Sequence, residues 1–205
     1  AQGVVEGRAF THPGFKLAFE APSGFYLVNG TRSVAISGQS GKGEFTGAAY
    51  GGDMEAYIRA AFAGLTEQGQ AQVTPQAIQR TTVNGIPAAY GTARVQGESS
   101  MLDVTVFAYE FSKTEAFHFL TIVPAGSTAT FNSMYGSMRR ITAAQAAAVK
   151  PRKLVVVTAK AGDTVQSLAA RMAYTDAPLE RFLVLNALTA SSRITAGQKV
   201  KIITY

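Results

Sequence analysis

Two neighbouring stretches that are apolar on both faces constrain the fold of this chain more than any other feature. The runs LDVTVFAYEF (102–111) and AFHFLTIV (116–123) are separated by four polar residues, SKTE. Successive side chains of a strand point to opposite faces of a sheet, so bulky apolar groups at odd and even positions need cover on both sides. We therefore expect the two runs to be neighbouring central strands of a sheet that is covered on both faces.

Helices that can cover this sheet are expected on either side of it in the sequence. One begins after Asp53, a residue type that caps helix N-termini, and its apolar residues recur at helical spacing. They are Met54, Tyr57, Ile58, Ala61, Phe62 and Leu65. A closing helix has a second apolar face. It consists of Phe131, Met134, Tyr135 and Met138.

Further strands are expected where Phe15, Leu17 and Phe19 alternate with other residues, and around Val34 and Ile36. Asn84-Gly85 predicts a tight hairpin turn because both residues tolerate positive φ. The glycine-rich GQSGKG (38–43) lacks the spacing of a phosphate-binding loop and is interpreted as a flexible hairpin loop. The expected fold class is α+β, an antiparallel sheet flanked by helices.

The layout of this first part resembles the PsbP-like sandwich. The resemblance rests on the F-x-L-x-F-E-x-P-S-G-F pattern of residues 15–25, a long helix, a meander of hairpins and a closing helix with SMRRI. Members of that fold family mostly provide binding and assembly surfaces. The resemblance therefore implies no set of catalytic residues.

A boundary is predicted in the alanine-rich stretch ITAAQAAAVKPRK, because Pro151 interrupts a continuing helix. We expect a sandwich domain at 1–142, a linker at 143–153 and a small domain at 154–205. Residues 1–149 contain ten Lys/Arg and ten Asp/Glu, whereas residues 150–205 contain nine and three. The net charge of +6 therefore belongs to the C-terminal part.

The C-terminal part has the order strand, helix, helix, strand. LVVVTAK is followed by Gly162-Asp163-Thr164, and either Asp163 or Thr164 can cap the helix that follows. The apolar face of that helix comprises Val165, Leu168, Ala169 and Met172. Pro178 suits the first turn of a second helix, with Asp176 as its expected cap. After Gly197-Gln198, KVKIITY alternates as a half-buried edge strand.

This order resembles a LysM module, a βααβ unit that grips the sugar backbone of peptidoglycan or chitin. The resemblance implies a sugar groove between the first strand–helix loop and the loop after the second helix. The candidate carbohydrate-binding residues are Gly162, Asp163, Thr164, Asn186, Ser191, Ser192 and Ile194. Two features depart from the family: the AYTDAP segment is not the usual short turn between the helices, and Tyr205 stands where many members have proline. The ALTASSR stretch of the second loop offers hydroxyls and an arginine but no aromatic platform. A docking or spacing unit of LysM shape is the alternative.

Charge and composition limit the partners. A basic module favours polyanionic surfaces, such as anionic lipids, cell-wall polymers or nucleic acid, although solvated surface charges explain the same count. Nucleic acid is the weakest candidate because the basic residues are scattered and not interleaved with stacking aromatics. No stretch reaches the ~20 apolar residues of a membrane span. The start of the chain lacks the regions of a signal peptide, so Ala1 is either a mature end or a cut within a longer protein.

Catalytic and metal-binding patterns are absent from the sequence. The only histidines, His12 and His118, form no HExxH motif, and the chain has no cysteine. His118 lies between two phenylalanines in an expected strand, which favours a hydrogen-bonded sheet histidine. Glu110 and Glu115 flank one hairpin, where carboxylates are usually solvated. We expect no enzyme activity, metal or cofactor in this chain.

The two domains in this order resemble the C-terminal region of bacterial envelope zinc metallopeptidases related to the CAAX prenyl protease. The resemblance rests on two stretches of sequence, HPGFKLAFEAPSGFYLVNG and PRKLVVVTAKAGDTVQSLA. The resemblance implies a periplasmic or envelope location, a sandwich that binds a protein partner or protease substrate, and a LysM-like domain for attachment. Zinc is then expected only in a catalytic domain outside this chain. The alternative is a free-standing peptidoglycan-binding protein, and an autonomous carboxylate-based hydrolase is a third hypothesis.

Overall fold

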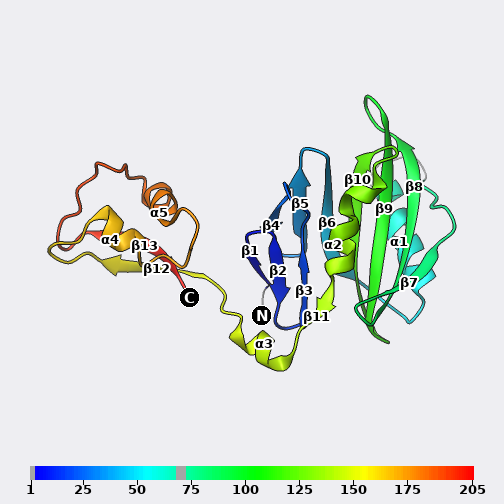
Figure 1. Ribbon diagram of the computed structural model, residues 1–205, viewed down its shortest axis with the longest axis horizontal. Helices are drawn as coiled ribbons and strands as arrows, with labels where there is room; N and C mark the ends of the chain where they lie inside the picture. The colour runs from blue at the N-terminus through cyan, green and yellow to red at the C-terminus, as the bar shows by residue number, and fades with distance from the viewer. Residues whose placement is uncertain (1–2, 68–72) are drawn as a thin grey trace. The chain divides into compact units, whose positions relative to one another are not determined.

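The computed structural model describes residues 3–67 and 73–205, which divide into two compact units. Unit 1 is Ala1–Val149 and unit 2 is Lys150–Tyr205 (Figure 1). Within the predicted linker, the alanine-rich run forms the short helix α3 (Ala143–Ala148), which is held by a capping box. Thr142 accepts a hydrogen bond from the Gln145 backbone N–H, and the Gln145 side chain accepts one from the Thr142 backbone N–H.

Unit 1 is built on a seven-stranded antiparallel sheet. The strand order is β4-β5-β6-β10-β9-β8-β7. The strands are β4 (Tyr26–Asn29), β5 (Val34–Gly38), β6 (Gly41–Ala48), β7 (Gln79–Val83), β8 (Ile86–Gln96), β9 (Met101–Ser112) and β10 (Glu115–Pro124). The two apolar runs are β9 and β10, which pair with each other near the middle of the sheet, as predicted. The turn between β7 and β8 has positive φ at Asn84 and Gly85, also as predicted.

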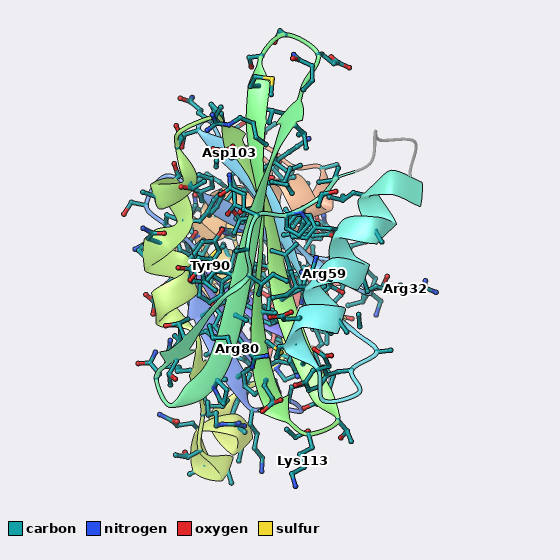
Figure 2. All side chains as sticks on the ribbon, turned by 90° about the vertical axis from the view of Figure 1, so that its right-hand side faces the viewer. Arg32, Arg59, Arg80, Tyr90, Asp103 and Lys113 are labelled. Atoms are coloured by element: carbon teal, nitrogen blue, oxygen red, sulfur yellow. The ribbon has the colours of Figure 1, made fainter. Side chains whose placement is uncertain are left out.

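Both faces of this sheet are covered. Helix α1 (Met54–Glu67) packs on one face, and Asp53 caps it by accepting a hydrogen bond from the Ala56 N–H at 3.1 Å. The other face is covered by the short helix η1 (Thr128–Phe131) and helix α2 (Asn132–Ser137), opposite α1 in Figure 2. Side chains of β9 alternate between the two cores: Val106 lies in the first and Phe107 in the second. The α+β fold class is thereby confirmed.

A second small sheet, which the sequence analysis did not predict, shares the α2 face. Its strand order is β1-β2-β3-β11. The strands are β1 (Val4–Glu6), β2 (Ala9–His12), β3 (Leu17–Glu20) and β11 (Arg139–Arg140). The strand expected from Phe15 begins only at Leu17, because Phe15 lies in the β2–β3 turn and is 44% exposed. Leu17 and Phe19 lie in the strand as expected, and both belong to the core.

The prediction of a flexible loop for the glycine-rich stretch 38–43 is wrong. Residues 41–48 form strand β6, which pairs with both β5 and β10, so only Gln39 and Ser40 remain as a turn. A Cβ atom on Gly43 would lie 2.8 Å from the Leu120 carbonyl oxygen. Glycine therefore allows a close approach of two strands at this position.

Unit 2 has the predicted βααβ order. It contains β12 (Lys153–Thr158), α4 (Val165–Ala169), α5 (Pro178–Asn186) and β13 (Lys199–Thr204), with β12 antiparallel to β13. Their apolar faces enclose one core around Leu168 and Phe182, both fully buried. Thr164 caps α4 in a capping box with Ser167. The prediction that Asp176 caps α5 is wrong, because the N-cap residue is Ala177.

The position of Ala177 explains why Asp176 does not cap α5. Ala177 takes a left-handed conformation with φ 47°, and its methyl side chain cannot accept a hydrogen bond. Asp176 instead accepts a hydrogen bond from the Arg181 guanidinium at 2.7 Å. The guanidinium holds the pKa of the Asp176 carboxyl below its usual value. The start of α5 is thus fixed by an ion pair and by Pro178 rather than by a side-chain cap.

Candidate functional site

The two loops expected to hold a ligand are joined by hydrogen bonds at their bases. The first loop connects β12 to α4 and starts at Ala159, while the second follows α5 and ends at Gly197-Gln198. The Ala159 N–H donates to the Gln198 carbonyl at 2.8 Å, and the Gly197 N–H donates to the Ala159 carbonyl at 2.8 Å. These hydrogen bonds join the beginning of one loop to the end of the other.

The first loop is held in shape by its own polar side chains. Asp163 accepts hydrogen bonds from the Lys160 N–H at 2.8 Å and from the Ser167 hydroxyl at 3.3 Å. Thr164 accepts one from the Ser167 N–H at 3.0 Å. Gly162 has φ 88°, and beyond its own and the two adjacent residues no described atom lies within 4 Å of the position that a Cβ would occupy. The backbone at Gly162 is therefore open to an approaching ligand.

Asn186 is occupied by bonds within the domain. Its amide nitrogen donates to the Phe182 and Lys201 carbonyls at 3.0 and 2.9 Å, and its oxygen accepts from the Lys201 N–H at 2.7 Å. The side chain therefore joins the end of α5 to the middle of β13. This is a structural role, and it leaves little hydrogen-bonding capacity for a ligand.

The serines of the second loop differ in exposure. Ser192 accepts a hydrogen bond from the Thr189 N–H at 2.9 Å, which shapes the turn, and it is partly buried. Ser191 is exposed, and its hydroxyl lies 3.1 Å from that of Thr189. Ile194 is half-buried against the core of unit 2. Of the seven predicted residues, Gly162, Thr164 and Ser191 are the exposed ones.

Unit 2 also contains an aromatic side chain outside these loops that the sequence analysis did not single out. The guanidinium carbons of Arg152 and Arg181 each lie 4.2 Å from the centroid of the Tyr174 ring. Beside this ring is a groove of about 430 Å³, lined in part by Met172 and by Val184, which is 83% exposed. A sequence signal for this ring exists: Tyr174 belongs to AYTDAP, the segment between the helices that departs from the family pattern.

The histidines and carboxylates of unit 1 do not form a catalytic arrangement. His118 is buried and lies 2.7 Å from the Tyr57 hydroxyl through its Nδ1 atom, as expected for a sheet histidine. Burial lowers the His118 pKa to about 4, so the ring is neutral at pH 7. Glu110 accepts a hydrogen bond from the Tyr50 hydroxyl. Two causes raise the Tyr50 pKa to about 12: burial, which is the larger, and the hydrogen bond to Glu110.

His12 belongs to a separate cluster from His118. Its Nδ1 accepts a hydrogen bond from the Phe15 N–H at 3.0 Å, and its ring stacks on the Phe15 ring at 4.2 Å. Desolvation lowers the His12 pKa below its usual value. Within residues 3–67 and 73–205, no three His, Asp or Glu side chains gather in a way that could hold a metal ion.

Comparison with protein families places unit 2 in a known class. Residues 157–202 match the family model of the LysM domain, so this stretch is a LysM domain. The match covers the βααβ unit from within β12 to within β13. No curated protein matches the chain.

Solved structures resemble a larger part of the chain. Cyanobacterial PsbP (CyanoP) from Synechocystis sp. PCC 6803 is 10% identical, with a TM-score of 0.50, and the match covers 67% of this chain and 94% of that one. This span is too long to lie within unit 2, so it includes unit 1, which shares the PsbP-like fold.

Two further structures are more distant by TM-score. A protein from Bacteroides thetaiotaomicron VPI-5482 is 16% identical, with a TM-score of 0.47, over 73% of this chain. The match spans 53% of the length of that protein. LpqN of Mycobacterium tuberculosis, described as involved in cell envelope biogenesis, is 10% identical, with a TM-score of 0.44, over 68% of this chain and 90% of LpqN.

These matches include no catalytic family. Among the described residues, no helix has the length and apolar character needed to cross a membrane.

Proposed function

We propose that this chain is a non-catalytic accessory region that binds cell-wall glycan through its LysM domain. The observation that carries the proposal is the LysM match of residues 157–202, together with the two loops joined at their bases. Gly162 of the first loop offers an open backbone, and Ser191 of the second loop offers an exposed hydroxyl. Groups of this kind bind uncharged, hydroxyl-rich ligands such as the N-acetylated sugar backbone of peptidoglycan.

The same proposal assigns unit 1 to a protein partner or substrate and places the chain in the periplasm or cell envelope. We further propose that the parent is an envelope zinc metallopeptidase, a proposal that rests on the resemblance of this domain order to the C-terminal region of that family. The alternative is a free-standing peptidoglycan-binding protein. The complete reading frame separates the two, because an HExxH helix encoded upstream is expected only for the protease.

Glycan binding can be tested by sedimenting the full chain with purified, insoluble peptidoglycan. About 0.5 M salt shortens the screening length to a few ångströms and suppresses attraction between surface charges. We expect the protein to remain in the pellet under these conditions. Retention that disappears with salt would mean that only charge holds the chain, and would contradict the proposal.

A matched pair of variants locates the binding surface. Ser191→Tyr adds a bulky ring to the second loop, whereas Thr175→Tyr adds the same ring to the exposed inter-helix segment near the Tyr174 groove. We expect Ser191→Tyr to raise the Kd for peptidoglycan, measured from the pelleted fraction at several peptidoglycan concentrations, at least about tenfold, which is the effect of losing ~1.4 kcal/mol of binding free energy. Thr175→Tyr should have no effect. The reverse result would assign binding to the groove beside Tyr174.

A further inference from the structure

A cavity of about 300 Å³ lies in unit 1, between α2 and the sheet edge formed by β7 and β8. Figure 2 shows Tyr90 of β8 on the side of the sheet that faces α2, away from α1. Thr81 and Val83 of the edge strand β7 line one part of the cavity, and Asn132 of α2 lines another. The cavity is distinct from the LysM loops, which belong to unit 2.

One wall of the cavity is a stack of three aromatic rings. The Tyr90 ring is nearly parallel to that of Phe107, with 5.2 Å between centroids and 6° between planes. Phe107 in turn stacks on Tyr135 at 4.5 Å and 14°. Tyr90 is the last ring of the stack on the β7 side, and it is only half-buried. No described side chain or backbone group forms a hydrogen bond with its hydroxyl.

The polar groups that line the cavity are neutral. Hydroxyls come from Thr81, Thr92, Thr105 and Thr128, and an amide comes from Asn132. Among the described residues, no charged side chain lines the cavity. An ionic ligand would lose its hydration here without gaining a counter-charge, which disfavours it strongly.

Elements around the cavity hold it in shape without a ligand. The Asn84 amide, in the β7–β8 turn, donates to the Gly136 and Met138 carbonyls at 3.1 and 2.8 Å and so ties the sheet edge to α2. The Tyr109 hydroxyl donates to the Tyr135 carbonyl at 2.6 Å. The Tyr135 hydroxyl lies 2.6 Å from that of Thr121. A site built on tied helices and strands is preorganised for binding.

We propose that this cavity is a second binding site, which takes a neutral sugar ring. Sugar rings have a C–H face that packs on an aromatic ring and hydroxyls around the edge that pair with hydroxyl and amide groups. The half-buried ring of Tyr90 and the polar groups of Thr81 and Asn132, which line the same cavity, provide both kinds of contact. The proposal does not depend on glycan binding by the LysM domain.

The test is a titration of the full chain followed by NMR, because resonances of the two units report separately. The probes are glucose, N-acetylglucosamine and, as a flat ligand without hydroxyls, indole. For one neutral sugar ring, a Kd on the order of 1 mM is expected. Shifts should occur at residues 79–92 and 128–136, including the Tyr90 ring, whether or not unit 2 responds.

Two substitutions and two matched controls test the contacts. Tyr90→Leu removes the ring and should weaken sugar binding in unit 1 about tenfold. Thr81→Val keeps the side-chain shape, removes one hydroxyl, and should weaken it about fivefold. The controls are Thr82→Val, on the same strand but outside the cavity lining, and Tyr26→Leu, a 60% exposed tyrosine on β4. Neither control should change the titration.

Two results would overturn the proposal. One is an absence of sugar-dependent shifts around the cavity at concentrations well above the expected Kd, or a response to indole alone. The other is sugar binding that survives both Tyr90→Leu and Thr81→Val. Because Thr81 is exposed and its replacement has the same shape, the second variant remains informative if Tyr90→Leu disturbs folding. Loss of peptidoglycan binding in unit 2 would leave these outcomes unchanged.

Discussion

At the scale of single residues, the burial of His118 makes the stability of the fold depend on pH. Its side chain is 5% exposed, and desolvation lowers its pKa to about 4 in the folded chain, against 6.5 for a free histidine. Between these values the unfolded chain binds the proton and the folded chain does not. The folded state is therefore favoured above pH 6.5, and that contribution is lost as the pH falls toward 4.

This coupling predicts the behaviour of His118→Gln. Wild type should lose about 3 kcal/mol of unfolding free energy from this residue between pH 7 and pH 4, and the variant should lack that part of the slope. Urea unfolding at several pH values measures the difference. His12→Gln is the control, since His12 is only partly buried, and it should keep most of the slope. Equal slopes in wild type and His118→Gln would contradict the prediction.

Asn186 is a residue for which structural and ligand-binding roles can be separated. Asn186→Ala leaves the Lys201 N–H and two carbonyls without their partners and should destabilise unit 2 by about 1–3 kcal/mol. Denaturation followed through amide resonances of residues 153–204 measures this loss. Ser191→Ala, in the exposed part of the second loop, should change stability by less than about 0.5 kcal/mol. A stable Asn186→Ala protein would mean that the three bonds contribute nothing.

At the scale of elements, the glycines of β6 and α1 have opposite roles. Gly43 faces the Leu120 carbonyl so closely that Gly43→Ala should cost roughly 1–3 kcal/mol, because one strand must shift. Gly64 lies within α1, and beyond the helix's own nearby backbone no described atom lies within 4 Å of its Cβ position, so Gly64→Ala should stabilise the fold by about 0.5–1 kcal/mol. Thermal unfolding measures both. A neutral Gly43→Ala would show that β6 and β10 are not tightly paired there.

The elements also show what sequence patterns can predict. β9, β10 and α1 were predictable because strong apolar patterns of period 2 or 3.6 set their type and burial. β6 was missed because its glycines signal loops locally, while the reason for them is a neighbouring strand that is distant in sequence. The short strands β1 and β2 have too few residues to show a period. Pairing that depends on tertiary contact leaves no local signal.

The same limit applies to the candidate sites. GDT and the following helix identified the first loop, because capping chemistry is local. Asn186 was placed in the site by resemblance alone, although its bonds to β13 give it a structural role. The cavity beside Tyr90 gathers residues from β7, β8, β9, η1 and α2. No motif in the sequence brings these together, so only the folded sheet reveals the cavity.

For the whole molecule, the charge distribution separates the roles of the two units. Unit 1 is close to neutral, whereas the nine basic residues of 150–205 outnumber the three acidic ones. Lys153 and Lys201 lie exposed on the paired strands β12 and β13. Long-range attraction to anionic polymers should therefore act through unit 2, and short-range contacts at its loops should decide which glycan is bound.

This division predicts a difference between two double variants with the same net charge. Lys153→Glu with Lys201→Glu changes unit 2, and Lys42→Glu with Lys113→Glu changes unit 1 equally. The unit 2 variant should elute from an anionic column at a salt concentration lower by roughly 0.1 M than the unit 1 variant, because screening at such salt confines attraction to nearby charges. Both should still sediment with peptidoglycan in high salt. Identical elution would mean that net charge alone, rather than its location in unit 2, governs attraction to anionic surfaces.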